Sequence, residues 1–247
     1  MSFFTSMWDL VVRYYPFFAD GIRSTLIIAL FAVLLGFILG TLLTLMRMSG
    51  WKILRWPANA FVEFFRGTPL LVQLMFIFYG LPMLGITFPQ IPFIPDFERF
   101  AAGIVAMSLN SAAYVSEIVR AGIQAVDKGQ MEAARSIGLT NAQAMRIVIL
   151  PQAMRNILPA LGNEFVTVIK ESSIVSVIGI GDIMFRTNDV IAATYQTLPA
   201  LAVALIIYFV LTFFFSRLVN YTEKKLQYDS RAKARAKAGA KTSHRTR

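Results

Sequence analysis

Two long stretches without a charged residue limit most strongly the folds that this chain can adopt. Residues 24–46 and residues 190–216 contain no Asp, Glu, Lys or Arg. An apolar run of 18 or more residues is long enough to cross the hydrocarbon core of a bilayer as a helix. Because 56% of the chain is hydrophobic and only 15% is charged, we predict a polytopic membrane protein.

Three further segments are long enough to cross a membrane but contain a few ionisable groups. At about 1.5 Å of rise per residue, each covers the ~30 Å hydrocarbon slab as a helix. Together with the two uncharged stretches, they predict an all-α integral membrane protein with five transmembrane helices. The three segments are residues 57–81, 99–123 and 158–183.

The basic residues between these segments predict an orientation. The connections after the first and third segments carry several Arg and Lys, whereas residues 82–98 carry none. Basic connections face the cytoplasm, so we expect the N-terminus outside and the C-terminus in the cytoplasm. This divides the chain into an extracytoplasmic segment (1–20), a transmembrane domain (21–220) and a basic cytoplasmic tail (221–247).

The tail accounts for most of the net charge of +10. Residues 217–247 hold ten Lys and Arg against Glu223 and Asp229, which leaves +8 in this segment. Its low complexity and lack of large apolar groups predict disorder. Attraction to anionic lipid, at about 1 kcal/mol per basic residue, explains the charge, and we expect no nucleic-acid partner.

The composition also limits the chemistry of the chain. It has no cysteine and one histidine, His244 in the tail, so a thiolate or histidine metal site and a Ser-His-Asp triad lack their residues. A phosphate-binding G-x-x-x-x-G-K-[ST] loop is also missing from the sequence. We therefore expect no metal, no cofactor and no enzymatic activity, with any ATP bound by a partner.

The loop between the third and fourth predicted helices, residues 127–151, is too polar to cross the membrane. Gly138 is placed to end a short helix in a left-handed conformation. Thr140 and Gln143 form a Thr-x-x-Gln capping box that starts a second helix, and we expect Pro151 to end it. The pattern predicts a helix–Gly turn–helix on the inner membrane surface. An amphipathic segment that merely covers the bundle is the alternative.

Polar residues line one face of the third predicted helix. An ionisable group near the middle of a bilayer costs at least ~2.5 kcal/mol, so each needs a partner or a water-filled path. For any single group, an ion pair that holds helices together is a sufficient explanation. For the whole set, a path for a charged solute explains more. The face consists of Gly103, Met107, Asn110, Tyr114, Glu117 and Ala121.

The polar loop resembles the EAA loop of permease subunits in ATP-binding-cassette importers. In that family the loop contacts a separate ATPase. The resemblance rests on Glu132-Ala133-Ala134, Gly138 and Leu150-Pro151, with Val148 where Ile is usual. It implies that the ATPase-coupling residues are Glu132, Ala133, Ala134, Arg135 and Gly138.

Three membrane segments are similar to signatures of the polar amino acid importer permeases, the branch with histidine, arginine, glutamine and glutamate systems. They are residues 66–73, 110–122 and 163–173. The resemblance implies a type I importer with two permeases, identical or paralogous, two ATPases and an extracytoplasmic amino-acid-binding protein. It implies substrate-binding residues, namely Asn110, Ser111, Tyr114, Glu117 and Thr68.

Elementary chemistry suggests roles for these residues. Glu117 is suited to pair an α-ammonium, whereas Asn110, Ser111 and Thr68 are suited to hydrogen-bond a carboxylate, and Tyr114 supplies a rim and a hydroxyl. Two other functions remain open. An ion-coupled secondary transporter would share the buried charges but has no need of the hairpin, and a membrane anchor without transport activity leaves the polar face unexplained.

Overall fold

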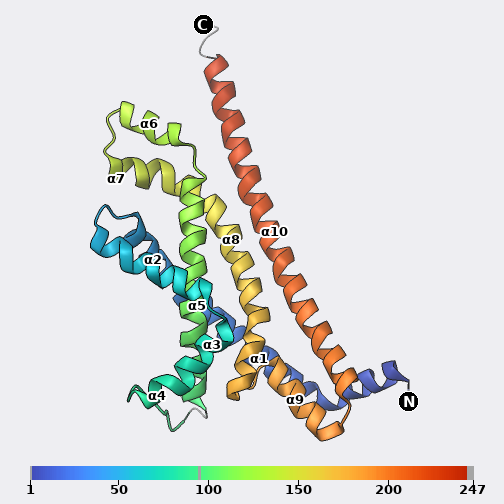
Figure 1. Cartoon of the computed structure of the whole chain (residues 1–247). Coiled ribbons are helices and arrows are strands. Elements are labelled where there is room, and N and C mark those ends of the chain that lie inside the picture. The colour runs from blue at the N-terminus through green and yellow to red at the C-terminus, as the bar shows by residue number, and fades with distance from the viewer. Residues whose placement is uncertain (1, 94–95, 244–247) are drawn as a thin grey trace. The chain divides into compact units, whose positions relative to one another are not determined.

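The computed structural model describes residues 2–93 and 96–243, with side chains described as far as residue 225. Within these residues every regular element is a helix (Figure 1), and the all-α prediction is confirmed. In chain order the elements are α1 (Phe3–Met48), α2 (Lys52–Gly67), α3 (Leu70–Met75), the π-helix η1 (Phe76–Gly80), α4 (Leu81–Met83), α5 (Phe97–Gln124), α6 (Lys128–Ser136), α7 (Asn141–Ala144), the π-helix η2 (Met145–Ile149), α8 (Leu150–Glu171), the 3-10 helix η3 (Ser172–Ile178), α9 (Ile183–Thr194) and α10 (Thr197–Ser243).

The contacts divide the chain into two compact units. The first comprises Met1–Glu117 and Glu164–Phe213, and the second comprises Ile118–Asn163 and Phe214–Arg247. The helices α5, α8 and α10 each contribute residues to both units. The polar face of α5 down to Glu117 belongs to the first unit, and the loop of residues 127–151 belongs to the second.

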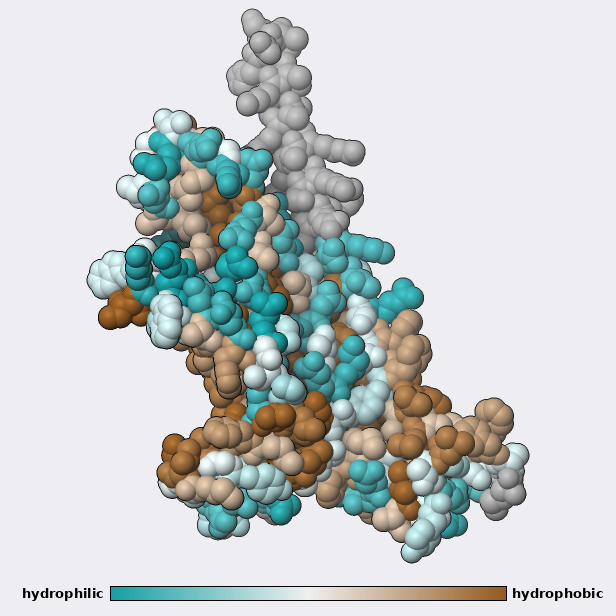
Figure 2. Space-filling view, in the orientation of Figure 1, coloured by the Kyte–Doolittle hydropathy of each residue, from teal (hydrophilic) through white to brown (hydrophobic). Residues whose placement is uncertain are grey.

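Three helices of the described residues are long and apolar enough to cross a membrane. They are α1, α5 and Thr197–Lys225 of α10, and a fourth span results if α2 and the helical segment 70–83 count as one bent span. The count of five therefore stays a prediction. Large apolar side chains of α1 and α10 are widely exposed, which a bilayer-facing surface explains. Figure 2 shows hydrophobic side chains gathered over α3 and α4.

Three predicted spans differ from the structure in their shape. The segment 158–183 is α-helical only as far as Glu171, continues as the 3-10 helix η3 and breaks at Gly179, which has φ +81°. The segment 57–81 is not one helix, because α2 ends at Gly67 and the chain turns by 109° before the next helical segment. Pro69 explains the break, since the residue before a proline is pushed out of the helical region, and Thr68 is extended at φ −120° and ψ 148°. The segment 190–216 is interrupted where Tyr195 ends α9 at φ 57°.

The first helix is longer than its predicted span and bends near its start. Ser2 caps it by accepting a hydrogen bond from the amide of Thr5 at 3.3 Å. Tyr14 departs from helical geometry, with φ −113° and ψ 18°. Pro16, two residues later, lacks an amide donor and clashes with the preceding turn, which explains the kink.

The small residues of α1 allow close packing against α5. A Cβ atom added at Gly40 would lie 2.6 Å from the backbone oxygen of Ala112, and one at Gly36 would lie 3.0 Å from the side chain of Ser111. Thr44, on the same face, donates to the backbone oxygen of Ser116 at 3.0 Å. This ridge therefore packs within the subunit, as small residues do between membrane helices.

The start of α9 is joined to α10 by a buried carboxylate and to α1 by a backbone amide. Asp182 is fully buried and caps α9 by accepting from the amide of Phe185 at 2.9 Å. It also accepts from the hydroxyl of Tyr208 at 3.3 Å. On the α1 side, Thr25 accepts from the amide of Ile183 at 3.3 Å. The bond between Ile183 and Thr25 joins residues 158 positions apart.

The last helix, α10, continues to Ser243 and so includes most of the segment for which the sequence predicts disorder. Ala, Lys and Arg are strong helix formers, which accounts for a helical backbone there. The side chains of residues 226–247 lie outside the described part of the chain. The disorder of the basic tail remains a prediction.

We expect Gly40→Ala to destabilise the protein, because the new methyl group would meet the backbone of α5 rather than a movable side chain. Overpacking of this kind costs typically about 1–3 kcal/mol. Thermal unfolding of the purified protein in detergent measures it. Gly50→Ala is the matched control, since a Cβ atom there meets nothing within 4 Å. Equal unfolding temperatures for the two variants would contradict this packing.

Candidate functional site

All five residues that the resemblance implies for substrate binding belong to the first unit. Asn110, Tyr114 and Glu117 follow one another along one face of α5, and Ser111 lies beside Asn110 on the same helix. Thr68 follows the last turn of α2 as its C-cap. Among residues 101–120, all of which are described, Tyr114 alone is classed as exposed. From Gly103 to Glu117 the face is therefore mostly covered except around Tyr114, whereas Ala121 at its end is exposed.

An amide network joins two of these residues. The Nδ2 atom of Asn110 donates to Oε1 of Gln73 at 2.9 Å. The Nε2 atom of Gln73 donates to the hydroxyl of Thr68 at 2.8 Å and to the backbone oxygen of Phe65 at 2.8 Å. Through these hydrogen bonds, Gln73 connects the end of α2 and the residues before α3 with α5. Sequence reasoning did not single out Gln73, although it ends the 66–73 motif.

Ser111 faces a different part of the first unit. It is 1% exposed, and its hydroxyl donates to Oε1 of Glu164 on α8 at 2.9 Å. Gly36 of α1 packs against it. The structure therefore brings Asn110 and Thr68 together through Gln73 and gives Ser111 a separate acidic partner.

Glu117 lies between two arginines. Its Oε1 atom is 2.9 Å from Nη2 of Arg47 and 3.3 Å from Nη1 of Arg66. Arg47 is itself held on both sides, because its Nε donates to Asn59 at 2.8 Å and its Nη1 donates to the hydroxyl of Ser116 at 3.1 Å. The cluster of Arg47, Glu117 and Arg66 fastens the ends of α1 and α2 to α5.

Arg47 was not predicted as part of the site. It comes directly after the uncharged stretch 24–46, where it serves the sequence argument only as an orientation signal. Its partner Glu117 lies 70 positions further along the chain, and a pairing over that separation leaves no local pattern to find. Arg66, by contrast, stands at the start of the 66–73 motif.

Exposure separates the residues that a solute can reach from those already covered. The side chain of Arg66 is 45% exposed, and Tyr114 is 39% exposed. The guanidinium of Arg66 lies over the ring of Tyr114, with 5.8 Å between its central carbon and the ring centroid, a cation–π arrangement. Asn110 is only 6% exposed. The reachable groups are thus Arg66, Tyr114 and the partly exposed edge of Glu117.

The loop of residues 127–151 forms the predicted hairpin of two short helices, α6 and α7 (Figure 1). Gly138 has φ +89°. Its amide donates to the oxygen of Arg135 at 3.0 Å, and that of Leu139 donates to the oxygen of Ala134 at 3.2 Å. This pair of bonds is a Schellman motif. The capping box of Thr140 and Gln143 is also present, so the helix–Gly turn–helix prediction is confirmed.

The prediction that Pro151 ends the second helix is wrong. The chain passes from α7 through the π-helical turn η2 directly into α8, where Pro151 is the second residue. In η2 the amide of Leu150 donates to the oxygen of Met145, five residues back. Pro151 has no amide donor, so the missing backbone bond falls directly after the π-helical turn, and the helix continues past it.

The hairpin exposes most of the residues that the resemblance assigns to ATPase coupling. Glu132, Ala133, Arg135 and Gly138 are exposed, but Ala134 is 4% exposed and packs inward. Ile137, which the motif does not single out, is 79% exposed beside Gly138. Figure 2 shows mostly hydrophilic side chains over this hairpin.

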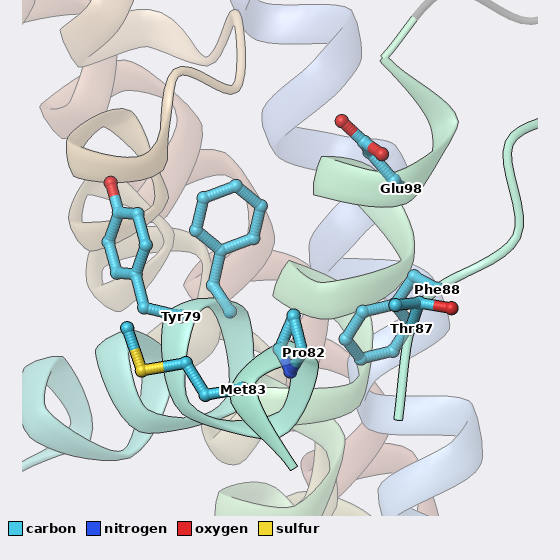
Figure 3. Close-up of a pocket in the computed structure, with 7 residues that line it drawn as sticks. Tyr79, Pro82, Met83, Thr87, Phe88 and Glu98 are labelled. Carbon is cyan, nitrogen blue, oxygen red and sulfur yellow. The ribbon is translucent and has the colours of Figure 1, made fainter. Parts of the chain in front are cut away.

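A separate cavity of about 510 Å³ lies in the first unit. Figure 3 shows Tyr79, Pro82 and Met83 from the η1–α4 segment together with Glu98 from α5. None of the predicted substrate residues lines it. Among the described residues, no group of three or more His, Cys, Asp or Glu is arranged to hold a metal ion.

Two transport permeases are similar to this chain in sequence. The arginine transport system permease protein ArtQ of Bacillus subtilis (strain 168) is 45% identical over 213 residues, which cover 86% of this chain and 93% of that protein. The putative glutamine transport system permease protein GlnP of Rickettsia conorii is 40% identical over 224 residues, covering 89% and 99%.

Solved structures show the same fold. The crystal structure of an amino acid ABC transporter with histidines matches with a TM-score of 0.82 and 45% identity, covering 91% of this chain and 99% of that chain. The inward-facing MetNI methionine ABC transporter matches with a TM-score of 0.67 at 20% identity, covering 92% and 99%, which is a likeness of fold alone. Residues 32–228 match the family described as binding-protein-dependent transport system inner membrane component. The chain belongs to this family of membrane-embedded transport components and has the all-helical fold of ABC importer permeases.

Proposed function

We propose that this chain is the permease subunit of an ATP-driven importer and forms the path by which a polar or charged amino acid crosses the membrane. The relatives that are 40–45% identical are named as arginine and glutamine transport permeases, which supports an amino acid as the solute. The observation that carries the proposal is the exposed, doubly capped hairpin α6–α7 on a chain whose sequence lacks a phosphate-binding loop.

The hairpin is suited to pass a rigid displacement to the membrane helices. Its turn is held by the Schellman bonds around Gly138, and its second helix continues without a break into α8. A partner ATPase that grips Glu132, Arg135 and the exposed Ile137 would therefore move α8 with the hairpin. A mobile loop would absorb the same displacement. ATP is bound and hydrolysed by that partner, not by this chain.

The solute path runs along the α5 face. An arginine exposed at membrane depth is costly in lipid, so the exposure of Arg66 supports a water-filled space beside Tyr114. We assign solute contact to the predicted set of Asn110, Ser111, Tyr114, Glu117 and Thr68. In the described state Tyr114 and Glu117 are the members nearest to that space.

The remaining partners follow from the same assignment. An extracytoplasmic amino-acid-binding protein delivers the solute, and a second permease, identical or paralogous, completes the path. The chain crosses the inner membrane several times, with its N-terminus outside and its tail in the cytoplasm. An ion-coupled transporter is the competing function, and it predicts uptake that follows a proton or sodium gradient and ignores changes in the hairpin.

Glu132→Arg is expected to abolish ATP-driven amino acid uptake by reversing a charge at the ATPase contact, while membrane insertion stays intact. Uptake into proteoliposomes containing the full complex measures this. Asp9→Arg, a charge reversal at an exposed position of α1 in the first unit, is the control and should retain uptake. Normal uptake by Glu132→Arg, or uptake driven by an ion gradient without ATP, would contradict the assignment.

Glu117→Gln is expected to lower uptake at least severalfold while the complex still assembles. The change removes the negative charge that positions Arg47 and Arg66, so Arg66 loses its fixed place beside Tyr114; hydrogen bonds to charged groups contribute about 1.5–3 kcal/mol. Copurification of the ATPase and initial uptake rates are the two measurements. A complex that fails to assemble would show instead that Glu117 serves the fold and not transport.

A further inference from the structure

We propose that the guanidinium of Arg66 binds the α-carboxylate of the transported amino acid. This inference rests on the proposed function and adds to it the chemical group that the permease recognises. Arg66 lies in the last turn of α2, directly before the break at Gly67 and Thr68. Its side chain is 45% exposed, more than either partner in its ion cluster, at 12% for Arg47 and 21% for Glu117.

The two arginines of the cluster differ in how firmly they are held. Arg47 contacts Glu117 at 2.9 Å, Asn59 at 2.8 Å and the Ser116 hydroxyl at 3.1 Å. Arg66 has one ion pair, at the longer distance of 3.3 Å, among the contacts described for it. Arg47 is therefore a fixed structural cation, and Arg66 is the cation that a ligand can engage.

The charges favour an anionic ligand. Arg47 and Arg66 bring two positive charges to the single negative charge of Glu117. An α-ammonium group approaching Glu117 would meet both guanidinium groups, whereas a carboxylate is attracted by their excess charge. The structure thus argues for a carboxylate at this point rather than the ammonium that the sequence suggested for Glu117.

When the solute carboxylate replaces Glu117 as the partner of Arg66, each charged group of the cluster still has a partner of opposite charge. When a solute carboxylate takes the place of Glu117 at Arg66, Glu117 keeps its shorter contact with Arg47. Arginine presents a planar fork that matches a carboxylate with two parallel hydrogen bonds. The ring of Tyr114, 5.8 Å from the guanidinium carbon, holds the fork at the exposed side of α5.

The contact with Arg66 recognises the α-carboxylate, which all amino acids share. It makes the permease sensitive to the presence of an α-carboxylate and leaves the choice among side chains to other groups. A decarboxylated analogue, which keeps the side chain and the amine, is therefore the probe that separates this contact from every other one.

The test is equilibrium binding to the purified permease–ATPase complex in lipid nanodiscs. The probes are L-arginine with agmatine and L-glutamine with 4-aminobutanamide, so that each amino acid is paired with an analogue lacking the α-carboxylate. We expect the wild-type complex to bind at least one of the amino acids at least tenfold more tightly than its analogue. Arg66→Gln should reduce that ratio to within about twofold by weakening amino acid binding alone. Arg66→Lys should give an intermediate ratio, because it keeps the charge and loses the fork.

Arg55→Gln is the matched control, since it removes an exposed arginine from the same helix, and its ratio should equal that of the wild type. A preserved tenfold preference in Arg66→Gln would overturn the inference, as would an equal loss of both probes. ATP-driven uptake by the wild type without measurable binding of either amino acid would also overturn it. Wild-type complex that takes up no amino acid with ATP would instead refute the proposed function, and the inference with it.

Discussion

The ion cluster of Arg47, Glu117 and Arg66 is the interaction that builds the candidate site, because it joins three helices of the first unit. Charges within a membrane are costly unless they pair or meet water; here all three charges pair, with Arg47 12% exposed and Arg66 45% exposed. The cluster fastens the ends of α1 and α2 to α5 at one point. The close packing of Gly36 and Gly40 against α5 brings those backbones near enough for the contact.

The two functional regions have different physical designs. The hairpin is stabilised by local bonds, namely the Schellman turn at Gly138 and the capping box at Thr140, and it offers an exposed surface to a partner. The α5 face is stabilised by long-range polar contacts and exposes few groups. The proposed function needs both designs, because an ATPase would act on a locally stabilised hairpin while a mostly covered polar face keeps the solute path shut.

The sequence predicted most accurately the features that depend on neighbouring residues. The turn at Gly138 and the cap formed by Thr140 and Gln143 follow from local rules. The break before Pro69 also follows from a local rule, since a residue before proline avoids the helical region. The apolar residues on both sides of it nevertheless led to the prediction of one continuous span, 57–81. Pro151 was misread because a π-helical turn let the helix continue. The pairing of Arg47 with Glu117, and the roles of Gln73 and Glu164, depend on tertiary contacts that one sequence does not reveal.

The central claim is that the face of α5 around Tyr114 borders a water-filled solute path. Because the chain contains no cysteine, single cysteines report their surroundings without background. We expect Tyr114→Cys in the assembled transporter to react with a charged, membrane-impermeant thiol reagent, more slowly when the transported amino acid is present, and Ala112→Cys, at a fully buried position, to remain unreactive. A Tyr114→Cys variant that reacts only with lipid-soluble reagents, at a rate unaffected by amino acid, would contradict the account.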